Sequence, residues 1–164
     1  KKALKLITPH SFNLIGGGTT VRELIKILPD SLHATFITVN PLTALDLMEK
    51  PNIETILIGG KISKYSQMVI GGNVINELSS IKADLCILGT NAIHAAEGIA
   101  DSDWETVQVK RAMMNASKKT TILAISEKLN TTARFNVAKI ADVHYLITEA
   151  EPQNSLLRPY TEGG

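Results

Sequence analysis

The alternation of short apolar runs with amphipathic stretches is the feature that most constrains the fold of this chain. Runs rich in β-branched and aliphatic residues recur along the sequence, and several are separated by apolar residues at helical spacing. Parallel strands need long crossovers, and helices are the usual crossovers. The pattern therefore predicts an α/β fold with a mainly parallel, Rossmann-like sheet flanked by helices. The predicted strands are 12–15, 34–39, 53–58, 85–89, 121–125 and 143–147.

The segments between these strands predict the helices and irregular parts. Asn40 as N-cap and Pro41 at the first helical position mark one helix start, and Asn73 is a candidate cap for another. Residues 61–72 read as a short hairpin-like excursion, and 90–98 as a loop. The predicted helices are 21–28, 42–49, 74–78, a longest helix from 102–105 to about 117, and a weak one at 137–140.

Composition limits the class of protein. A chain of 164 residues with 44% hydrophobic and 20% charged residues suits one globular domain. The single cysteine, Cys86, lies in an apolar run, which predicts a core residue and a cytoplasmic protein. No run is long enough to span a membrane, and a net charge of +1 does not suggest a nucleic-acid surface.

Three consecutive glycines stand where the first strand gives way to the first helix, in Gly16 to Thr20. Glycines allow a bulky anion to approach the main chain, and the following helix offers unpaired N–H groups and the positive end of its dipole. The segment lacks the spacing of a dinucleotide fingerprint and the Gly-Lys-Ser/Thr ending of a P-loop. It is a candidate phosphate site.

A purely structural interpretation of the same segment is open. Thr20 followed by Glu23 fits the capping box, in which both side chains only start the helix. What favours a pocket is that polar or glycine clusters follow several predicted strands. In open α/β sheets, ligands bind beyond the carboxyl ends of the strands. The clusters are 16–20, Asn40, 59–60, Asn91 and 126–128.

With these residues laid out, the chain resembles the C-terminal effector domain of the DeoR family of bacterial transcription repressors over about 14–148. No single motif is specific, but their order and spacing are. The motifs are Gly18-Thr19-Thr20, Thr38-Val39-Asn40, Gly59-Gly60, Ala83-Asp84-Leu85 to Leu88-Gly89, Gly98 with Asp103 and Glu105, Lys110-Arg111-Ala112-Met113, and Ser126-Glu127-Lys128.

The resemblance implies a ribose-5-phosphate-isomerase-like fold and a phosphorylated sugar as effector. It places the phosphate on Gly17, Gly18, Thr19, Thr20 and Lys128, and it places sugar contacts at Asn40, Asn91, Glu105 and Lys110. The sequence departs from the family pattern at Gly16 and Gly17, at Asn91-Ala92 where aspartate-glycine is usual, and at Ile125 where aspartate is usual.

The resemblance also implies the organisation of a longer protein. Residues 1–10 would be a linker from a missing N-terminal winged helix-turn-helix, 11–150 the sensor domain and 151–164 a tail. Operator DNA would be bound only through that missing domain, and a homodimer or higher homo-oligomer would match a palindromic operator. No cofactor, metal or membrane partner is expected.

The competing hypothesis is a sugar-phosphate isomerase or amino-sugar-phosphate deaminase on the same fold. Such chemistry needs a carboxylate base and groups that stabilise developing charge. Asp101, Asp103 and Glu105 are the available carboxylates, with Lys110 as a partner. Ser102 with Glu105 also fits a capping box, and an asparagine at position 91 cannot act as a base, so the sequence favours binding without turnover.

Other candidate residues have ordinary structural interpretations. When the resemblance is set aside, the sequence favours solvated lysines at Lys110 and Lys128 over ligand contacts. His94 is expected at the surface rather than on a metal, because no second ligand stands at suitable spacing. Trp104 is expected to pack the start of the longest helix onto the sheet.

Overall fold

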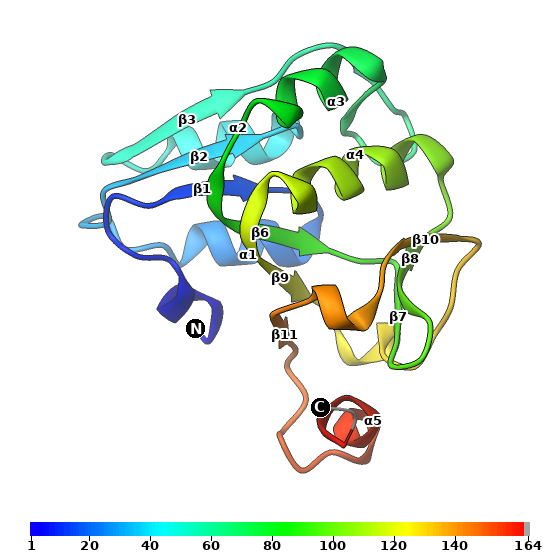
Figure 1. Ribbon diagram of the computed structural model, residues 1–164. Helices are drawn as coiled ribbons and strands as arrows, with labels where there is room; N and C mark the ends of the chain where they lie inside the picture. Colours follow the sequence, from blue (N-terminus) through cyan, green and yellow to red (C-terminus); the bar gives the residue numbers. More distant parts are fainter. Residues whose placement is uncertain (163–164) are drawn as a thin grey trace.

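A six-stranded parallel sheet forms the centre of the protein, whose computed structural model describes residues 1–162 (Figure 1). The strand order is β11-β9-β6-β1-β2-β3, and every neighbouring pair is parallel. The prediction of an α/β fold with a mainly parallel sheet is confirmed. The strands are β1 (Phe12–Ile15), β2 (Ala34–Thr38), β3 (Ile53–Leu57), β6 (Ala83–Gly89), β9 (Ser117–Leu123) and β11 (Tyr145–Ile147).

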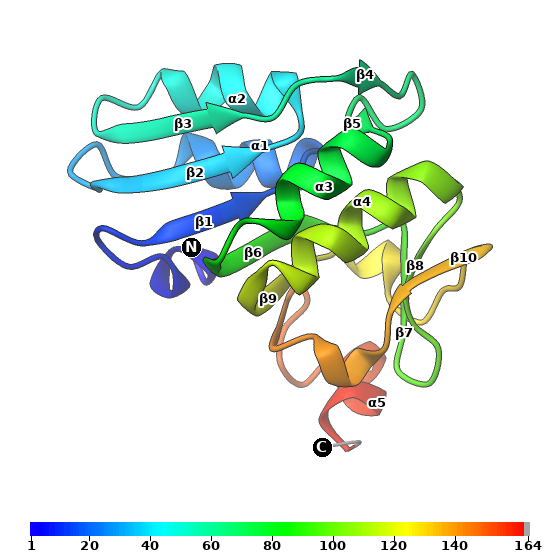
Figure 2. The ribbon, with the colours of Figure 1, turned by 45° about the horizontal axis from the view of Figure 1, so that its top comes forward.

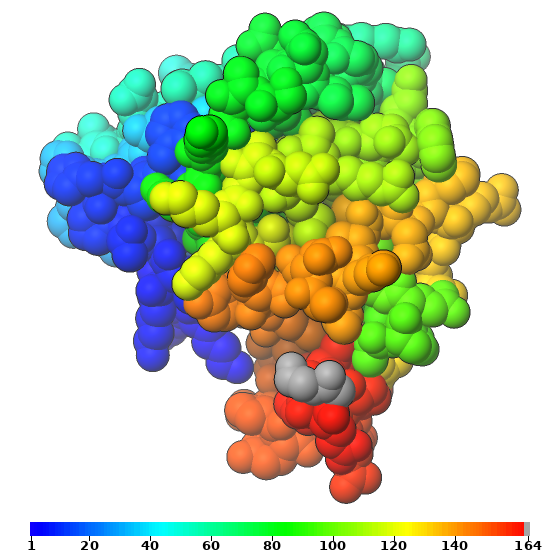
Figure 3. Space-filling model, in the orientation of Figure 1, coloured from blue at the N-terminus to red at the C-terminus, as the bar shows by residue number. Residues whose placement is uncertain are grey.

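Helices cover both faces of this sheet (Figures 1 and 2). On one face pack α1 (Thr19–Lys26) and α2 (Pro41–Met48), and on the other α3 (Gly72–Ser79) and α4 (Trp104–Asn115). Figure 3 shows α3 and α4 side by side over their face. Successive strand residues point to opposite faces, so Leu14 joins the core under α3 and α4, and Ile15 joins the core under α1 and α2.

The order of strands creates a reversal between β1 and β6. The chain leaves β1 through α1 to β2 on one side, and it leaves β6 through α4 to β9 on the other. The two connections diverge and leave a crevice above the carboxyl ends of these two strands. Crevices of this kind are the usual ligand sites of open α/β sheets.

Two small antiparallel sheets lie beside the main one. The predicted hairpin within 61–72 is confirmed as β4 (Lys61–Ile62) paired with β5 (Val69–Ile70). The other sheet has the order β10-β8-β7 and was not predicted. Its strands are β7 (Ala92–His94), β8 (Gly98–Asp101) and β10 (Phe135–Ala138).

This second sheet corrects two predictions. The predicted loop 90–98 contains β7 and the start of β8, which pair through residues such as Ile93 and Ile99. The predicted weak helix 137–140 is wrong, because Val137 is buried in β10 and only a 3-10 turn, Ile140–Asp142, follows. Pairing with β8, distant in sequence, outweighs the local helical signal here.

Helix starts also differ from prediction in detail. Gly71, with a φ of +108°, is the N-cap of α3, and Asn73 lies inside the first turn instead of capping it. The longest helix ends at Asn115, and residue 117 already begins β9. Trp104 packs edge-on against Phe135 of β10 rather than onto the main sheet, with ring centroids 5.3 Å apart.

Both terminal segments pack against the domain. Ala3 and Ile7 are buried around the 3-10 helix η1 (Ala3–Leu6), in the core under α1 and α2. In the tail, a 3-10 turn (Ser155–Leu157) precedes α5 (Arg158–Thr161). The Tyr160 hydroxyl donates a hydrogen bond to the Ile93 carbonyl (3.0 Å) and accepts one from the Asn130 N–H (3.0 Å). The division at 10 and 150 stays a prediction, and residues 163–164 of the predicted tail lie outside the described residues.

Three features of the structure limit the kinds of function that the described residues can support. Cys86 is buried in β6, and burial raises the pKa of its thiol to about 12, as suits a core residue. Within residues 1–162, no helix is both long and apolar enough to cross a membrane. The same residues contain no group of three or more His, Cys, Asp or Glu side chains placed to hold a metal ion.

The turn into β8 depends on a glycine. Gly98 has a φ of +83°, and a Cβ added there would lie 2.0 Å from the Ala138 carbonyl oxygen. We expect Gly98→Ala to lower the free energy of unfolding by roughly 1–3 kcal/mol, because strain and a backbone clash combine. Urea denaturation measures the effect. Gly72→Ala is the control: an added Cβ meets open space there, so a change within about 0.5 kcal/mol is expected, and equal losses in both variants would contradict the argument.

Candidate functional site

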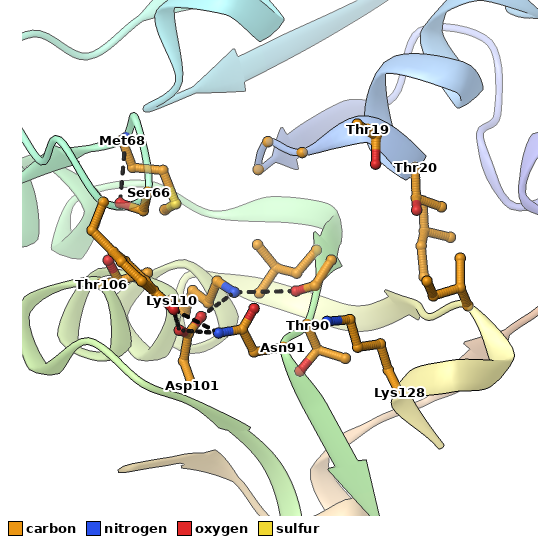
Figure 4. A pocket seen from close by; sticks show the side chains of 18 residues that line it. Thr19, Thr20, Ser66, Met68, Thr90, Asn91, Asp101, Thr106, Lys110 and Lys128 are labelled. Atoms are coloured by element: carbon orange, nitrogen blue, oxygen red, sulfur yellow. Dashed lines mark hydrogen bonds and ion pairs between the residues drawn. The ribbon is translucent and has the colours of Figure 1, made fainter. Parts of the chain in front are cut away.

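A cavity of about 410 Å³ opens at the crevice between β1 and β6. Its walls come from the turn after β1, the ends of β6 and β9, the β4–β5 hairpin, and the start of α4. Figure 4 shows threonine hydroxyls on one side and a cluster of polar side chains on the other. The pocket therefore lies where the alternation of strands and helices predicts a ligand.

The turn after β1 presents unused main-chain donors to the pocket. Gly18, with a φ of +95°, is the N-cap of α1 and has no side chain to satisfy the first N–H groups of the helix. Among the residues that the structure describes, no acceptor is bonded to the N–H groups of Gly17, Gly18, Thr19 or Thr20. Unpaired N–H groups at a helix start favour an anion.

The conformation of this turn is fixed from β6 and α2. The Gly16 N–H donates to the Ile87 carbonyl (2.9 Å), and the Thr43 hydroxyl donates to the Gly16 carbonyl (2.9 Å). A Cβ on Gly17 would lie 2.1 Å from Nδ2 of Asn40, so only glycine fits against that side chain. The donors of the turn are thus held in place before any ligand arrives.

The capping-box interpretation of Thr20 and Glu23 is wrong. The helix begins at Thr19, two residues earlier than that motif requires, and no side chain among the described residues caps it. Glu23 pairs with Lys26 on the exposed surface of α1 (2.6 Å) instead of reaching back. The Thr20 hydroxyl lines the pocket.

Lys128 supplies a positive charge on the opposite wall. It ends the 3-10 turn η2 (Ser126–Lys128), which follows β9, and its side chain extends into the pocket (Figure 4). Within residues 1–162 its ammonium group forms no ion pair with a carboxylate. The start of the same turn is held by Glu149, whose carboxylate accepts from the Ser126 N–H at 2.9 and 3.0 Å.

A buried ion pair forms the other end of the pocket. Asp101, at the end of β8, accepts from the Lys110 ammonium of α4 at 2.9 Å, with both side chains largely buried. The same carboxylate accepts from the Ser102 N–H (2.7 Å), the Asn91 amide (3.0 Å) and the Tyr65 hydroxyl (3.4 Å). Lys110 also donates to the Gly89 carbonyl (3.3 Å). This end presents polar donors and acceptors suited to hydroxyl groups.

Comparison with known proteins identifies the fold family of the chain. The profile of the DeoR C terminal sensor domain matches residues 1–150. This chain belongs to the DeoR sensor-domain family.

Curated relatives of this DeoR sensor domain are longer proteins. It is 32% identical over 154 residues to the HTH-type transcriptional repressor GlcR of Bacillus subtilis, covering 93% of this chain and 58% of that protein. It is 26% identical over 162 residues to the glycerol-3-phosphate regulon repressor of Escherichia coli, covering 99% of this chain and 64% of that protein. The chain therefore spans about three fifths of the length of these relatives.

Solved structures agree with the fold. Ribose 5 phosphate isomerase A from Neisseria gonorrhoeae aligns with a TM-score of 0.56 at 16% identity, over 84% of this chain and 52% of that one. The delta subunit of eIF2B from Chaetomium thermophilum aligns with a TM-score of 0.60 at 17% identity, over 92% and 53%. At such identities the likeness supports the fold alone.

Most of the predicted site residues of this DeoR domain line one pocket. They are Gly17, Gly18, Thr19, Thr20, Asn91, Lys110 and Lys128. The structure does not bring the other two to its walls. Asn40 caps α2 by accepting from the Leu42 and Thr43 N–H groups, and it packs behind Gly17. Glu105 lies on the exposed face of α4, outside the lining, so the helical spacing that carries Lys110 inward turns Glu105 away.

Several lining residues were not predicted as site residues. The sequence marks Asp101 only as a candidate catalytic base, although its position between the predicted sugar contacts Asn91 and Lys110 is a usable signal for a binding residue. Tyr65, Ser66 and Met68 reach the pocket from the β4–β5 hairpin, an irregular segment in which nothing in the sequence marked them. Thr90 and Thr106 complete the unpredicted polar lining.

The contribution of the buried Asp101–Lys110 ion pair to stability can be tested by mutation. Lys110→Met leaves the Asp101 carboxylate buried without its cation, which should lower the free energy of unfolding by roughly 3–5 kcal/mol. The control Lys118→Met breaks the Lys118–Asp84 pair, whose side chains are 75% and 48% exposed, so a loss below about 1 kcal/mol is expected. Urea denaturation of both variants measures the difference, and similar losses would contradict the assigned burial.

The hydrogen bonds from Ser126 to Glu149, which hold the turn that carries Lys128, predict a pH dependence of stability. Hydrogen bonds from Ser126 and neighbouring donors lower the pKa of Glu149 from 4.5 to about 2. A carboxyl whose pKa is depressed by folding stabilises the protein above its unfolded pKa and loses that effect as pH falls through the folded pKa. Glu149→Gln should therefore lower the melting temperature modestly near neutral pH, with the difference vanishing between about pH 4.5 and 2.

Melting curves of Glu149→Gln across pH test this expectation. Glu127→Gln is the matched control, since its exposed carboxylate makes no hydrogen bond or ion pair within residues 1–162. A difference between Glu149→Gln and the parent chain that persists unchanged at pH 2 would show that the carboxylate charge is not what holds the turn.

Proposed function

We propose that this DeoR sensor domain binds a phosphorylated sugar or related polyol phosphate in the β1–β6 pocket. Binding would modulate operator DNA binding by a full-length repressor that carries a winged helix-turn-helix. The observation that carries the proposal is the set of four unpaired N–H groups from Gly17 to Thr20, which face a lysine across the cavity.

Charge and geometry support a phosphate at the glycine turn. A phosphate needs several donors, and the turn supplies main-chain N–H groups together with the hydroxyls of Thr19 and Thr20. Lys128 adds a full positive charge that no carboxylate among the described residues neutralises. The cavity of about 410 Å³ is within the size range of small-molecule sites.

The Asp101–Lys110 ion pair supports sugar contacts at the other end of the pocket. Lys110 donates to Asp101 and Gly89, which leaves one of its three N–H donors for a ligand. Asn91, the residue that replaces the family's usual aspartate, turns its amide nitrogen to Asp101 and leaves its oxygen as an acceptor. Acceptors and donors at this wall suit neighbouring hydroxyl groups of a sugar or polyol.

The relatives support a regulatory role. Their names describe transcriptional repressors, one of them of a glycerol-3-phosphate regulon, and this chain spans only part of their length. An effector shifts such a protein only by its different affinity for two arrangements, with couplings of about 1–3 kcal/mol. A symmetric oligomer would match a palindromic operator.

The alternative is turnover by a sugar-phosphate isomerase or an amino-sugar-phosphate deaminase. Among the described residues, Asp101 is the one carboxylate in the pocket lining. Its Oδ1 accepts from Ser102, Asn91 and Tyr65, and its Oδ2 accepts from Lys110, so the carboxylate already holds the pocket wall together. A general base must be within reach of the proton that it removes. Asp103 caps α4 by accepting from the Thr106 N–H and hydroxyl, and Glu105 is exposed. Neither of these two candidate bases lines the pocket, so we favour binding.

A ligand panel tests the proposal. Sugar phosphates and glycerol 3-phosphate at a hundred times their dissociation constant should stabilise the chain by about 2.7 kcal/mol in thermal shift assays. The matching unphosphorylated compounds should have far less effect. Lys128→Met should weaken the best ligand at least about tenfold, since a charge-assisted hydrogen bond is lost, whereas Lys139→Met, at an exposed lysine outside the pocket, should not.

Two outcomes would overturn the proposal. Equal stabilisation by phosphorylated and unphosphorylated compounds would contradict the proposed phosphate site. Conversion of ribose 5-phosphate or glucosamine 6-phosphate that is lost in Asp101→Asn would show that the domain is an enzyme and not only a sensor.

A further inference from the structure

The outer edge of the main sheet combines an unpaired strand with exposed apolar side chains. β3 is the last strand in the sheet order and, within residues 1–162, pairs only with β2. Figures 1 and 2 show it at the rim with α2 beside it. Unpaired edges are templates for further strands, and soluble proteins usually protect them with charges, prolines or covering segments. We propose that two copies of this chain associate through β3 and α2.

The main-chain groups that face outward can be assigned. The Ile58 N–H donates to the Thr38 carbonyl of β2 at 3.0 Å, so residues 56 and 58 bond inward. Successive residues of a parallel strand alternate in direction. Thr55 and Leu57 therefore direct their N–H and C=O groups away from the sheet, where a second strand would pair.

Apolar side chains flank this edge on both faces of the sheet. On the α2 side Leu45 is 59% and Met48 69% exposed, and Leu57 of the strand is 45% exposed. The Asp46 carboxylate pairs with Arg22 of α1, which directs the opposite side of α2, with Met48, toward the rim. On the other face Ile56 is 39% exposed. Clustered exposed apolar side chains of this kind mark interaction surfaces.

A second copy is the occupant that the arrangement favours. A two-fold axis between two copies of β3 pairs the edge strands antiparallel, satisfies both sets of outward groups, and brings Leu45 and Met48 of both copies together across the seam. It also directs Glu54 of one strand toward the carboxyl end of the other, where Lys61 follows the strand. A parallel arrangement would align Glu54 with Glu54, which is unfavourable.

The position of the chain's first residues agrees with this assignment. Lys5 and neighbouring residues line one cavity together with Leu85, Lys119 and Tyr145, in β6, β9 and β11. Those strands form the other half of the sheet. A domain that precedes Lys1 would join there, away from β3, and would leave this edge free for a second copy.

Sedimentation velocity over a concentration series tests the interface. The parent chain should reach a dimer mass, and Leu45→Glu/Met48→Glu should weaken the dimer roughly a hundredfold or more, because like charges would face each other across the seam. Leu57→Pro, which removes an outward N–H and keeps the inward bonds, should do the same. Leu156→Glu, at an exposed apolar residue in the tail, should leave the dimer intact.

Cross-linking gives an independent readout that needs no destabilising change. Ile56→Cys should form an intermolecular disulfide on oxidation, and Leu156→Cys should not. Cys86 does not interfere, because it is fully buried. A parent chain that stays monomeric, or an oligomer that keeps its mass in the α2 and β3 variants and does not cross-link through position 56, would overturn the proposal. Circular dichroism of each variant separates loss of association from loss of fold.

Discussion

The reversal of chain direction between β1 and β6 is the constraint on which the rest of the structure depends. Because α1 and α4 carry the chain away on opposite sides, no connection in the described part of the chain passes over the boundary between these strands. The hydrogen bond from the Gly16 N–H to the Ile87 carbonyl extends the pairing of the two strands to the rim of the crevice. The N–H donors of the glycine turn and the carboxyl end of β6 therefore face the same cavity.

The second helix holds that turn, which explains two residues that do not touch the pocket. Asn40 caps α2 and packs against Gly17, and Thr43 binds the Gly16 carbonyl. A side chain at position 17 would push the turn away from this support. Asn40 therefore supports the shape of the turn without lining the pocket. A sequence motif shared with a family of binding sites does not by itself distinguish contact from support.

The sequence was sufficient for the main sheet and for most of the pocket, because the signals involved are local. A strand buried on both faces, such as the run that contains Cys86, reads as a continuous apolar segment. Seven of the nine predicted site residues line the pocket because parallel strands place their carboxyl ends at one edge.

What the sequence did not reveal depends on contacts between distant residues or on backbone angles. β7, β8 and β10 are short, and β10 pairs with β8 through Phe135 and Asp101, so no local period marks them. The positive φ of Gly18 moves the start of α1 and removes Thr20 from the cap. The arrival of Tyr65 at the pocket is set by how the β4–β5 hairpin folds back, which its irregular sequence does not encode in any periodic pattern.

The contacts of Asp101 connect several elements around the pocket. Ser102, Asn91 and Tyr65 all donate to its Oδ1, and Lys110 donates to its Oδ2. The Tyr65 contact is the longest, at 3.4 Å, and comes from a mostly exposed side chain. The Tyr65 hydroxyl also accepts a hydrogen bond from the Asn91 amide at 2.7 Å. Asn91 and Asp101 together therefore tie the β4–β5 hairpin, a segment outside the main sheet, to the wall of the pocket.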